Sequence, residues 1–452
     1  MTQMISMNPY TGKQNQAYQL FDLGLLDDAL SRVSQAQKVW AGQSLAARAQ
    51  YLQKLASLLR EKKDELARLA TSEMGKTLSS AAAEVEKCAW VCEYYAEQGA
   101  GMLATENVSG EGLDGKVMYQ PMGVILAIMP WNFPYWQVFR FLAPALMAGN
   151  AAVLKHASNV PGCALAIESL CREAGLDEDL FRTLLVSGSD SARVIRHPLI
   201  QAVTFTGSTD AGRKVAAEAG QYLKKTVLEL GGSDPYLVLD DADVGKAVES
   251  CVTSRLLNNG QSCIAAKRFI VDEKVYGAFV AGMADAMAAK SVGDPMQSDI
   301  DIGPQARDDL SESLAHQVEE SIRLGAVLVT GGKRKGSLFW PTVLGEVRPG
   351  MPAFDEELFG PVAAVIRARD EASAVALANQ SEFGLGGAVF SRDTERAERV
   401  ARQLQVGAVA INDFVKSDPR MPFGGVKASG YGRELSVFGI REFTNIKSLV
   451  TG

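Results

Sequence analysis

VMYQPMGVILAIMP, residues 117–130, is a mostly apolar run that predicts a strand, and a helical pattern follows it at 138–147. The next apolar run, AAVLKH at 151–156, again predicts a strand, with a helix after it near 164–173. Strands at 183–188 and 202–207 and a helix after Thr209 continue the series. Short apolar runs that alternate with helices are typical of a parallel α/β sheet.

The alternation starts again after the glycine pair Gly231-Gly232, so we predict two α/β sheets in series. Residues 27–99 precede the first sheet, and their three- and four-residue apolar spacing predicts long helices. The last stretch, EFTNIKSLVTG at 442–452, predicts a strand with no helix after it. An unpaired terminal strand invites pairing with another part of the chain or with another subunit. Strands of the second sheet are predicted to begin at residues 236, 268, 326, 362, 387 and 408.

The composition is that of an ordinary globular protein rather than a nucleic-acid or membrane protein. The chain has 452 residues, too many for one compact core, which favours two or three domains. A net charge of -7 offers no basic surface for nucleic acid. The first residues lack the pattern of a secretory signal, and the longest apolar runs are too short to cross a membrane. These features predict a cytoplasmic protein.

The six cysteines form no CxxC pair, and the three histidines do not cluster. A structural zinc site normally needs one of these patterns, so we predict no metal site. Five of the cysteines are expected to be reduced, packed thiols, because disulfides are rare in cytosolic proteins.

The sixth cysteine, Cys263, lies in LNNGQSCIAAKR at 257–268, directly after a polar, turn-prone run. A single cysteine is more often a packed thiol than a nucleophile. With only three histidines in the chain, the usual base for a catalytic cysteine is not evident. The residues alone therefore leave both a buried thiol and a nucleophile activated by another group open.

Two glycine-containing motifs have the spacing of phosphate-binding loops. GEGLDG at 110–115 fits GxGxxG but lacks the strand before it and the helix after it, so we predict a loop. GSTDAGRK at 207–214 follows a predicted strand and opens a helix, an arrangement that directs free backbone N–H groups at an anion. Its Arg213 and Lys214 do not fit a Walker A loop, and a simple strand-to-helix turn is the alternative.

Glu229 and Asn132 are two further candidates. Glu229 ends a predicted strand just before two glycines, which let the backbone approach a ligand, although most such glutamates are solvated. Asn132 lies in PWNFP at 130–134, where its amide could donate a hydrogen bond to a ligand or cap the following helix.

Taken together, eight motifs in order make the chain resemble the NAD(P)-dependent aldehyde dehydrogenase superfamily nearly end to end. The motifs are NPYTGK (8–13), PWNFP (130–134), KHAS (155–158), FTGSTDAG (205–212), LELGG (228–232), NGQSC (259–263), ELFGP (357–361) and PFGGVKASGYGRE (422–434). The resemblance implies a Rossmann-like cofactor domain from 1–111 and 122–230 and a catalytic domain from 231–430. It also implies a small β oligomerisation element from 112–121 and 431–452, and hence a homodimer or homotetramer.

The resemblance assigns roles to the candidate residues. Cys263 would attack an aldehyde, Asn132 would stabilise the oxyanion with the Cys263 backbone N–H, and Glu229 would activate the hydrolytic water, so that no histidine is needed. The cofactor is expected to be NAD or NADP. NAD-specific relatives commonly carry Glu at the position of Ser158, so the neutral serine predicts that NADP is tolerated. The residues expected to bind the cofactor are Trp131, Lys155, Ser158, Gly207, Ser208, Gly212, Leu230, Glu357 and Phe359.

The expected substrate follows from Arg140, eight residues after Asn132 and about two helical turns further along the substrate entrance. Relatives that oxidise succinate semialdehyde have arginine there, and a guanidinium binds a carboxylate bidentately. A surface or structural arginine is the alternative. A second arginine known in some of these relatives is replaced by Leu257, so Ser417 and Arg420 are expected to complete the site.

The sequence as a whole most resembles bacterial succinate semialdehyde dehydrogenases, which convert this aldehyde to succinate through a thiohemiacetal and a thioester. Broad specificity for other short carboxylated or neutral aldehydes is the alternative. Acyl transfer to coenzyme A is disfavoured because Glu229 is present. A cofactor-free cysteine hydrolase would need a thiol–histidine pair, and an inactive relative would not be expected to keep Cys263, Glu229 and Asn132 together.

Overall fold

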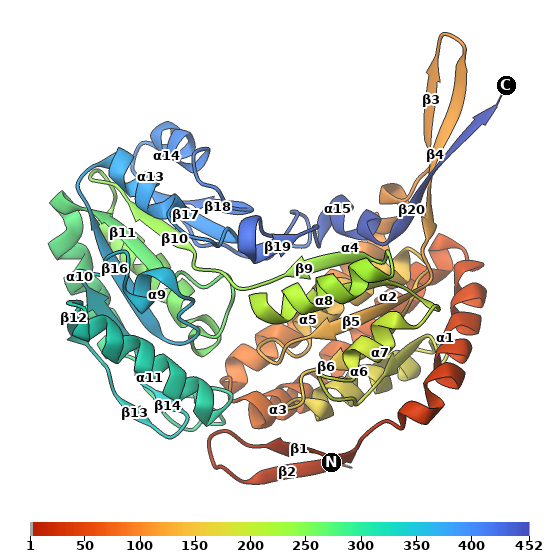
Figure 1. The fold of residues 1–452 in the computed structure, drawn as a ribbon, viewed down its shortest axis with the longest axis horizontal. Coiled ribbons are helices and arrows are strands. Elements are labelled where there is room, and N and C mark those ends of the chain that lie inside the picture. The colour runs from red at the N-terminus through yellow and green to blue at the C-terminus, as the bar shows by residue number, and fades with distance from the viewer. Residues whose placement is uncertain (1–2, 452) are drawn as a thin grey trace.

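The computed structural model describes residues 3–451 and consists of two lobes with a β arm that projects from one of them (Figure 1). One lobe contains a six-stranded sheet and the other a seven-stranded sheet, and helices cover both. The arm is a three-stranded sheet. The predicted class, two α/β layers in series with a small β element, is confirmed.

The six-stranded sheet has the order β19-β9-β8-β5-β6-β7, with β19 antiparallel to its neighbour and the other strands parallel. The carboxyl ends of parallel strands meet at one edge of a sheet, which is where ligands bind in such folds. The segments that follow β5, β8 and β9 therefore lie close together. The strands are β5 (Val124–Met129), β6 (Ala151–His156), β7 (Phe181–Thr183), β8 (Ile200–Thr206), β9 (Lys225–Glu229) and β19 (Gly430–Tyr431).

Two predicted strands differ from the structure in their bounds. The run at 117–130 forms two strands, since β4 (Leu113–Pro121) ends before Gly123, whose φ of 128° turns the chain into β5. The first of them belongs to the arm and the second to the sheet. The strand expected at 183–188 is β7, which ends at Thr183 because only three residues pair with β6.

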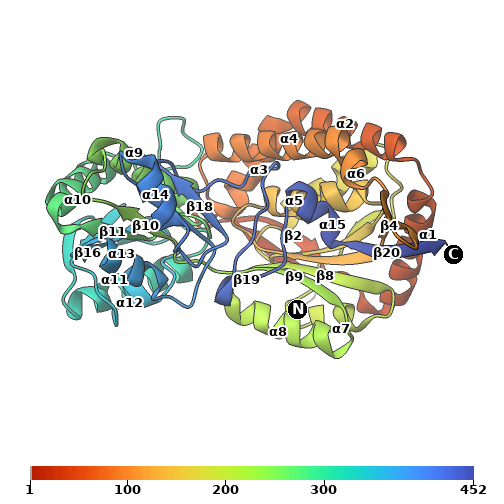
Figure 2. The same cartoon turned by 90° about the horizontal axis from the view of Figure 1, so that it is seen from above.

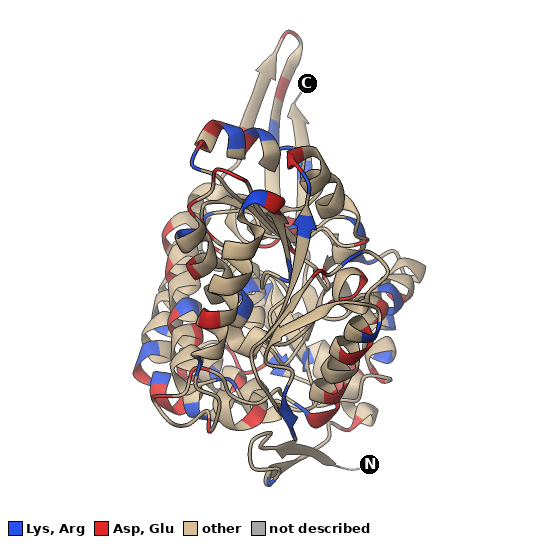
Figure 3. Cartoon of the chain, turned by 90° about the vertical axis from the view of Figure 1, so that its left-hand side faces the viewer, with Lys and Arg blue, Asp and Glu red and all other residues tan. Residues whose placement is uncertain are grey.

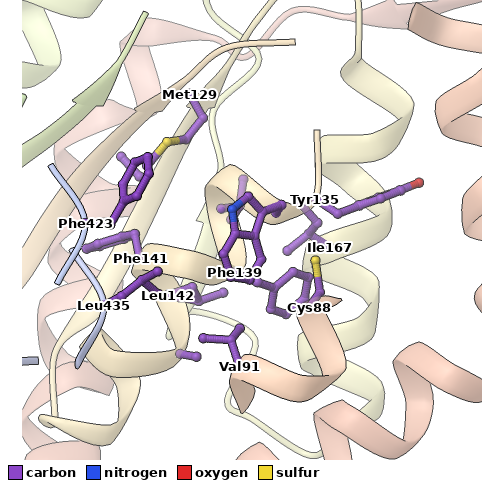
Figure 4. Packing of buried hydrophobic residues seen from close by; sticks show 14 of the residues in the cluster. Cys88, Val91, Met129, Tyr135, Phe139, Phe141, Leu142, Ile167, Phe423 and Leu435 are labelled. Carbon is purple, nitrogen blue, oxygen red and sulfur yellow. The ribbon is translucent and has the colours of Figure 1, made fainter. Parts of the chain in front are cut away.

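Helices cover both faces of this sheet. Figure 2 shows α7 and α8 on one side and the long helices α2 and α4 on the other. The side chains of α5 pack on those of α4 to form the core in Figure 4, where Phe139 and Leu142 lie near Cys88 and Val91. The helices of this lobe are α1 (Leu26–Ala41), α2 (Leu45–Glu61), α3 (Lys63–Met74), α4 (Leu78–Met102), α5 (Trp136–Met147), α6 (Pro161–Glu173), α7 (Ser191–Arg196), α8 (Thr209–Gln221) and α15 (Ser436–Glu442).

The seven-stranded sheet of the other lobe has the order β12-β15-β16-β11-β10-β17-β18, and only β12 is antiparallel to its neighbour. Its strands are β10 (Pro235–Val238), β11 (Arg268–Asp272), β12 (Val327–Thr330), β15 (Thr342–Gly345), β16 (Val362–Ala368), β17 (Gly386–Phe390) and β18 (Ala408–Ile411). Its helices are α9 (Val244–Leu256), α10 (Glu273–Ala288), α11 (Asp308–Arg323), α12 (Pro352–Asp355), α13 (Glu371–Asn379) and α14 (Thr394–Ala401).

Both faces of this second sheet are buried. Along β10 and β11, Tyr236 and Phe269 join the large core that continues into the first lobe, whereas Leu237 and Ile270 belong to a separate core. Burial on both faces explains why these strands are continuous apolar runs in the sequence rather than alternating ones.

The arm consists of β3 (Glu106–Gly110), β4 and β20 (Thr444–Thr451) (Figure 1). The terminal strand β20 pairs with β4 of the same chain, from Thr444 opposite Pro121 to Thr451 opposite Asp114. Because β20 is paired within the same chain, the terminal strand no longer supports the prediction of an oligomer. The GEGLDG motif at 110–115 contains the turn between β3 and β4, so it is not a phosphate loop. Two smaller hairpins complete the fold: β1 (Gln3–Met7) with β2 (Gln14–Gln19), and β13 (Arg334–Lys335) with β14 (Leu338–Phe339).

Acidic and basic residues are interspersed along the helices that Figure 3 shows, without a large region of one sign. None of the helices in residues 3–451 combines the length and the apolar character that crossing a bilayer requires. In the same residues, no three His, Cys, Asp or Glu side chains are grouped so that they could hold a metal ion.

Candidate active site

Cys263 lies in the loop between α9 and β11, and its side chain is partly exposed. Just before it, Asn258, Asn259 and Gly260 have left-handed backbone with φ values of 56°, 58° and 77°. Asparagine and glycine adopt this conformation at the least cost. A Cβ on Gly260 would lie 2.3 Å from the backbone carbonyl carbon of Gly360. The position therefore requires glycine, both for its backbone angle and for space.

Side-chain amides tie this loop to both lobes. Asn258 Nδ2 donates a hydrogen bond to the Asn132 carbonyl at 2.7 Å. Asn259 Nδ2 donates to the carbonyls of Gly75 at 3.0 Å and Pro304 at 3.1 Å. All three carbonyls lie on segments far from the loop in sequence. The polar run that was predicted to be turn-prone thus fixes the position of the thiol.

Burial raises the pKa of the Cys263 thiol to about 12; the nearby positive charges of Arg140 and Lys267 oppose this rise, and the charge of Glu229 adds to it. The thiol is therefore protonated in the resting protein and needs a base before it can act as a nucleophile. Among the residues that the structure describes, no histidine lines a cavity with Cys263. The ring of His156 instead lies 2.8 Å from the Pro134 carbonyl.

Glu229 is the last residue of β9, and its side chain is buried. Within residues 3–451, neither of its carboxylate oxygens has a hydrogen-bond partner. Burial raises the pKa of Glu229 to about 8; Glu434 adds to the rise, whereas Arg140 and Arg433 oppose it. A buried carboxyl group without partners costs stability, and strongly shifted pKa values cluster at functional sites.

Asn132 lies between β5 and α5, close to the loop that carries Cys263 (residues 257–267), which we call the thiol loop. The N–H groups of Tyr135 and Trp136 at the start of α5 donate to the Glu84 carboxylate at 2.8 Å and 2.9 Å. Glu84, and not Asn132, therefore caps this helix. The Asn132 amide donates to the Gln261 carbonyl at 3.0 Å, which directs it toward the loop of Cys263.

On one side of Cys263, a cavity of about 390 Å³ opens at the carboxyl edge of the six-stranded sheet; we call it the cofactor-side cavity. It brings together the thiol, Asn132 and six of the nine predicted cofactor residues. Those six are Trp131, Gly207, Ser208, Leu230, Glu357 and Phe359. The rings of Trp131 and Phe359 meet edge to face, 5.8 Å apart.

Glu357 is held in this cavity by two contacts. Its carboxylate accepts the Gly232 N–H at 3.1 Å and forms an ion pair with Lys267 at 3.2 Å. Lys267 Nζ also donates to the Cys263 carbonyl at 2.8 Å, so one buried ammonium links the thiol loop to Glu357.

The amino end of α8 faces the same cavity. Ser208 precedes the helix, and among the described residues its side chain makes no capping hydrogen bond. A Cβ on Gly212 would lie 2.4 Å from a methyl carbon of Leu230, so glycine lets α8 approach β9 closely. A helix amino end with free N–H groups suits a phosphate, and the aromatic wall opposite suits a flat ring. The cavity therefore fits a nicotinamide dinucleotide.

The other three predicted cofactor residues lie elsewhere. Ser158 is exposed and lines a cavity of about 860 Å³ together with Ser187 and Gly188. Arg307 lines both this cavity and the cofactor-side cavity, so the two adjoin there. Lys155 is in β6 and partly buried, which lowers its pKa. Gly212 acts through packing, as described.

On the opposite side of the thiol lies a smaller cavity of about 210 Å³, which we call the substrate-side cavity. Phe133, Trp136, Phe414 and Phe423 make most of its wall apolar. Its basic residues are Lys87, Arg140 and Lys416, and it also contains Ser417 and Leu257. Glu84 lines it as well, and its carboxylate is paired with Lys76. A site of this size and lining suits a short, linear molecule.

Two of the three predicted substrate residues line this cavity, and the third does not. Arg140 forms a buried ion pair with Glu434 at 2.5 Å, and its guanidinium lies 4.7 Å from the centre of the Phe423 ring. Ser417 accepts a hydrogen bond from Lys87 at 2.7 Å. Arg420 is exposed, pairs with Asp418 at 2.6 Å and is not part of the cavity wall.

Sequence reasoning missed Lys87, Glu434 and Lys267. The buried residues Glu84, Cys88 and Val91 mark one face of α4, and Lys87 falls at the edge of that face. A lysine there was a signal that the sequence did contain. Glu434 and Lys267 lie within the quoted stretches 422–434 and 257–268, but their roles could not be assigned because their partners, Arg140 and Glu357, are distant in the sequence.

The aldehyde dehydrogenase family matches residues 2–449 of the chain. A succinate semialdehyde dehydrogenase of Escherichia coli strain K12, named for use of NAD(P)+, is 44% identical, with 99% of this chain and 98% of that protein covered. A Deinococcus radiodurans succinate-semialdehyde dehydrogenase, named for NADP(+), is 45% identical over 98% of this chain and 93% of that protein. The crystal structure of succinic semialdehyde dehydrogenase from Streptococcus pyogenes in complex with NADP+ superposes with a TM-score of 0.96 at 36% identity, covering 99% of each chain.

Proposed function

The chain belongs to the aldehyde dehydrogenase family, and on that premise we propose that it oxidises succinate semialdehyde to succinate with NADP+ or NAD+. The observation that carries the proposal is the position of Cys263 between two cavities, one that fits a dinucleotide and one that is short and largely apolar with three basic residues. The names of relatives at 44% and 45% identity support the same substrate.

The first step is the addition of the Cys263 sulfur to the aldehyde carbon. Because burial keeps the thiol protonated, its proton must go to a base, and the Glu229 carboxylate, directly or through a water, is the candidate near it. The oxygen of the resulting thiohemiacetal would be stabilised by the Asn132 amide and the Cys263 backbone N–H. One donor of this kind is worth about 2.7–4 kcal/mol in a preorganised site.

Bound NAD(P)+ would accept the hydride that leaves the thiohemiacetal carbon, and a thioester on Cys263 remains. Glu229 first releases the thiol proton to solvent, and it then takes a proton from water as the water oxygen attacks the thioester carbonyl. The carbon–sulfur bond breaks, the acid leaves as a carboxylate and the thiol is restored. A Glu229 pKa of about 8 allows the group to hold and release a proton near neutral pH.

Trp131, Gly207, Ser208, Leu230, Glu357 and Phe359 would hold the nicotinamide and pyrophosphate parts of the cofactor, and Lys155 and Ser158 the adenosine part. Ser158 carries no negative charge that would repel a 2′-phosphate. We expect NADP+ to be used, with NAD+ as an alternative. A kcat/KM more than a thousandfold higher with NAD+, about 4 kcal/mol of discrimination, would contradict this.

A steady-state screen of the purified protein tests the proposal. Succinate semialdehyde, longer ω-carboxylated aldehydes and butanal are each supplied with NADP+ or NAD+, and the reduced cofactor is followed by absorbance. We expect kcat/KM for succinate semialdehyde to exceed that for butanal at least tenfold. Equal values would leave a broad-specificity aldehyde dehydrogenase. The Cys263→Ala variant is expected to form no reduced cofactor with any aldehyde.

The wider organisation is also part of the proposal. We propose a cofactor domain (1–111 and 122–230), a catalytic domain (231–430) and an oligomerisation element (112–121 and 431–452), in a cytoplasmic homodimer or homotetramer. Exposed apolar residues on β20, namely Ile446, Leu449 and Val450, support an oligomer through the arm. Light scattering on the intact protein and on a variant with these three residues changed to Ser tests it. A monomeric intact protein would exclude it.

A further inference from the structure

Lys87 on α4 is a partly buried cation that has no acidic partner within residues 3–451. Its ammonium donates to the Ser417 hydroxyl at 2.7 Å and lies 4.3 Å from the centre of the Trp136 ring. In the part of the chain that the structure describes, it forms no ion pair with Asp or Glu. An ammonium removed from water is costly unless a negative group compensates for it.

The ammonium faces the substrate-side cavity, which it shares with Cys263. We propose that the Lys87 ammonium and the Ser417 hydroxyl form the subsite that binds the carboxylate of an ω-carboxylated aldehyde while its carbonyl carbon meets the Cys263 sulfur. This inference rests on the proposed function, because it takes Cys263 as the reacting group. It adds Lys87, beside the Ser417 that the sequence already suggested, as the residue that selects a charged substrate.

The two arginines predicted for this task are each occupied by a carboxylate of the protein. Arg140 pairs with Glu434 at 2.5 Å, and both side chains are buried. Arg420 pairs with Asp418 at 2.6 Å outside the cavity. The third basic residue of the cavity, Lys416, pairs with Asp413 at 2.7 Å and is half exposed. Lys87 is the remaining cation that a substrate carboxylate can neutralise.

The electrostatics of Lys87 agree with an incomplete ion pair. The pKa of Lys87 is lowered to about 8, chiefly by burial and also by the positive charge of Arg140, whereas Cys88, Asp418 and Glu84 oppose the shift. A carboxylate placed beside the ammonium would favour its charged form and reverse this shift. Binding of an anionic substrate therefore stabilises Lys87 as well as the substrate.

The shape of the cavity limits the length of the substrate. At about 210 Å³ it is smaller than the roughly 300–1,000 Å³ of sites for drug-sized ligands. Phe133, Phe414 and Phe423 would enclose the methylene groups between the two polar ends. The subsite thus fits a short dicarboxylic semialdehyde rather than a long aliphatic aldehyde.

Lys87→Met keeps the length of the side chain and removes its charge, and Lys87→Arg keeps the charge. We expect kcat/KM for succinate semialdehyde to fall about 10- to 150-fold in Lys87→Met, mainly through KM, as for loss of one charged hydrogen bond. The value for butanal should change less than about threefold, and Lys87→Arg should recover most of the loss. Lys246→Met, an exposed lysine on α9, is the matched control and should change neither substrate.

Equal losses with both aldehydes would overturn the inference, because a structural lysine affects every substrate. A loss confined to Lys416→Met would also overturn it and would place the carboxylate at the mouth of the cavity. Lys87→Gln serves in place of Lys87→Met if the latter does not fold. Calorimetric titration with succinate gives a second readout without turnover: the intact protein should bind succinate more tightly than Lys87→Met by a similar factor, and equal binding would contradict the subsite.

The experiment separates this inference from the proposed function. If succinate semialdehyde is a poor substrate but a longer ω-carboxylated aldehyde is a good one and is lost in Lys87→Met, the subsite stands and the proposed substrate is wrong. If carboxylated aldehydes are good substrates and Lys87→Met leaves them unchanged, the proposed function stands and the subsite is wrong.

Discussion

Replacing Arg140 with Met should destabilise the protein by about 3–5 kcal/mol, because it leaves a buried carboxylate without its partner. The side chains of Arg140 and Glu434 are 2% and 4% exposed, and the two charges lie 2.5 Å apart. Glu229 lies nearby, and Glu434 raises its pKa whereas Arg140 lowers it. Without Arg140, the carboxyl groups of Glu434 and Glu229 would lie near each other in a region shielded from water.

The expected loss depends on pH. The pKa of Glu434 in the folded protein is raised above 4.5 by burial, and Arg140 opposes that shift. In the variant this pKa should rise further, so the folded state should hold its proton to a higher pH than the unfolded state. Stability is then lost as pH rises above the unfolded pKa, about 4.3. The difference between the variant and the intact protein should shrink as pH falls from 8 toward 5.

Urea unfolding followed by tryptophan fluorescence measures this difference at several pH values. The double variant Arg140→Met with Glu434→Gln should recover much of the stability, since both charges are then removed. A loss below about 1 kcal/mol, or a loss that does not change with pH, would refute the buried pair as the reason. Turnover adds a second check. Because Arg140 also lowers the pKa of Glu229 and of Cys263, its removal should slow butanal and succinate semialdehyde alike, unlike Lys87→Met.

Glu229→Gln should release about one reduced cofactor per active site and then stop, because the thioester is not hydrolysed; a rapid-mixing experiment measures this burst, and steady turnover would contradict the role. In the intact protein, kcat for butanal should rise with pH through about 8, as Glu229 loses its proton, if hydrolysis limits the rate. Affinity for succinate semialdehyde should instead fall as pH rises well above 8, because Lys87 loses its charge. Ser158→Glu should weaken NADPH binding at least tenfold, about 1.4 kcal/mol, and leave NADH binding nearly unchanged, as measured by fluorescence titration. Gly260→Ala should destabilise the fold by several kcal/mol, since its φ is 77° and a Cβ would lie 2.3 Å from the Gly360 backbone; a loss within about 0.5 kcal/mol would contradict this packing.

The sheets could be predicted from the sequence because their strands are apolar runs between glycines and helices. Arg268–Asp272 and Val362–Ala368 begin where the pattern placed them. The pairing of β20 with β4 could not be predicted, because it joins segments more than 300 residues apart and depends on where the arm projects. Register between distant strands is a property of the folded chain and not of local pattern.

The site residues could be predicted where a sequence motif fixes the backbone. They were harder to predict where the contacts depend on the conformation of long side chains. The motifs around Cys263 and Ser208 lead to residues that share one cavity. Arg140, Arg420 and Lys87 have long, flexible side chains whose partners are acidic residues or hydroxyls from other segments. Whether such a cation forms an ion pair within the protein or is available to a ligand depends on those partners. A single sequence does not contain that information.

The attachment of the thiol loop restricts how the enzyme can open. The buried side chains of Asn258 and Asn259 donate hydrogen bonds to carbonyls of both lobes. A hinge rotation that separates the lobes would break these hydrogen bonds, and each buried polar group left without a partner would cost about 1–3 kcal/mol. Substrate and product must therefore pass through the mouths of the cavities, by small movements of the side chains that surround them. Gating of turnover is thus expected to be a local, fast event and not a large opening and closing of the molecule.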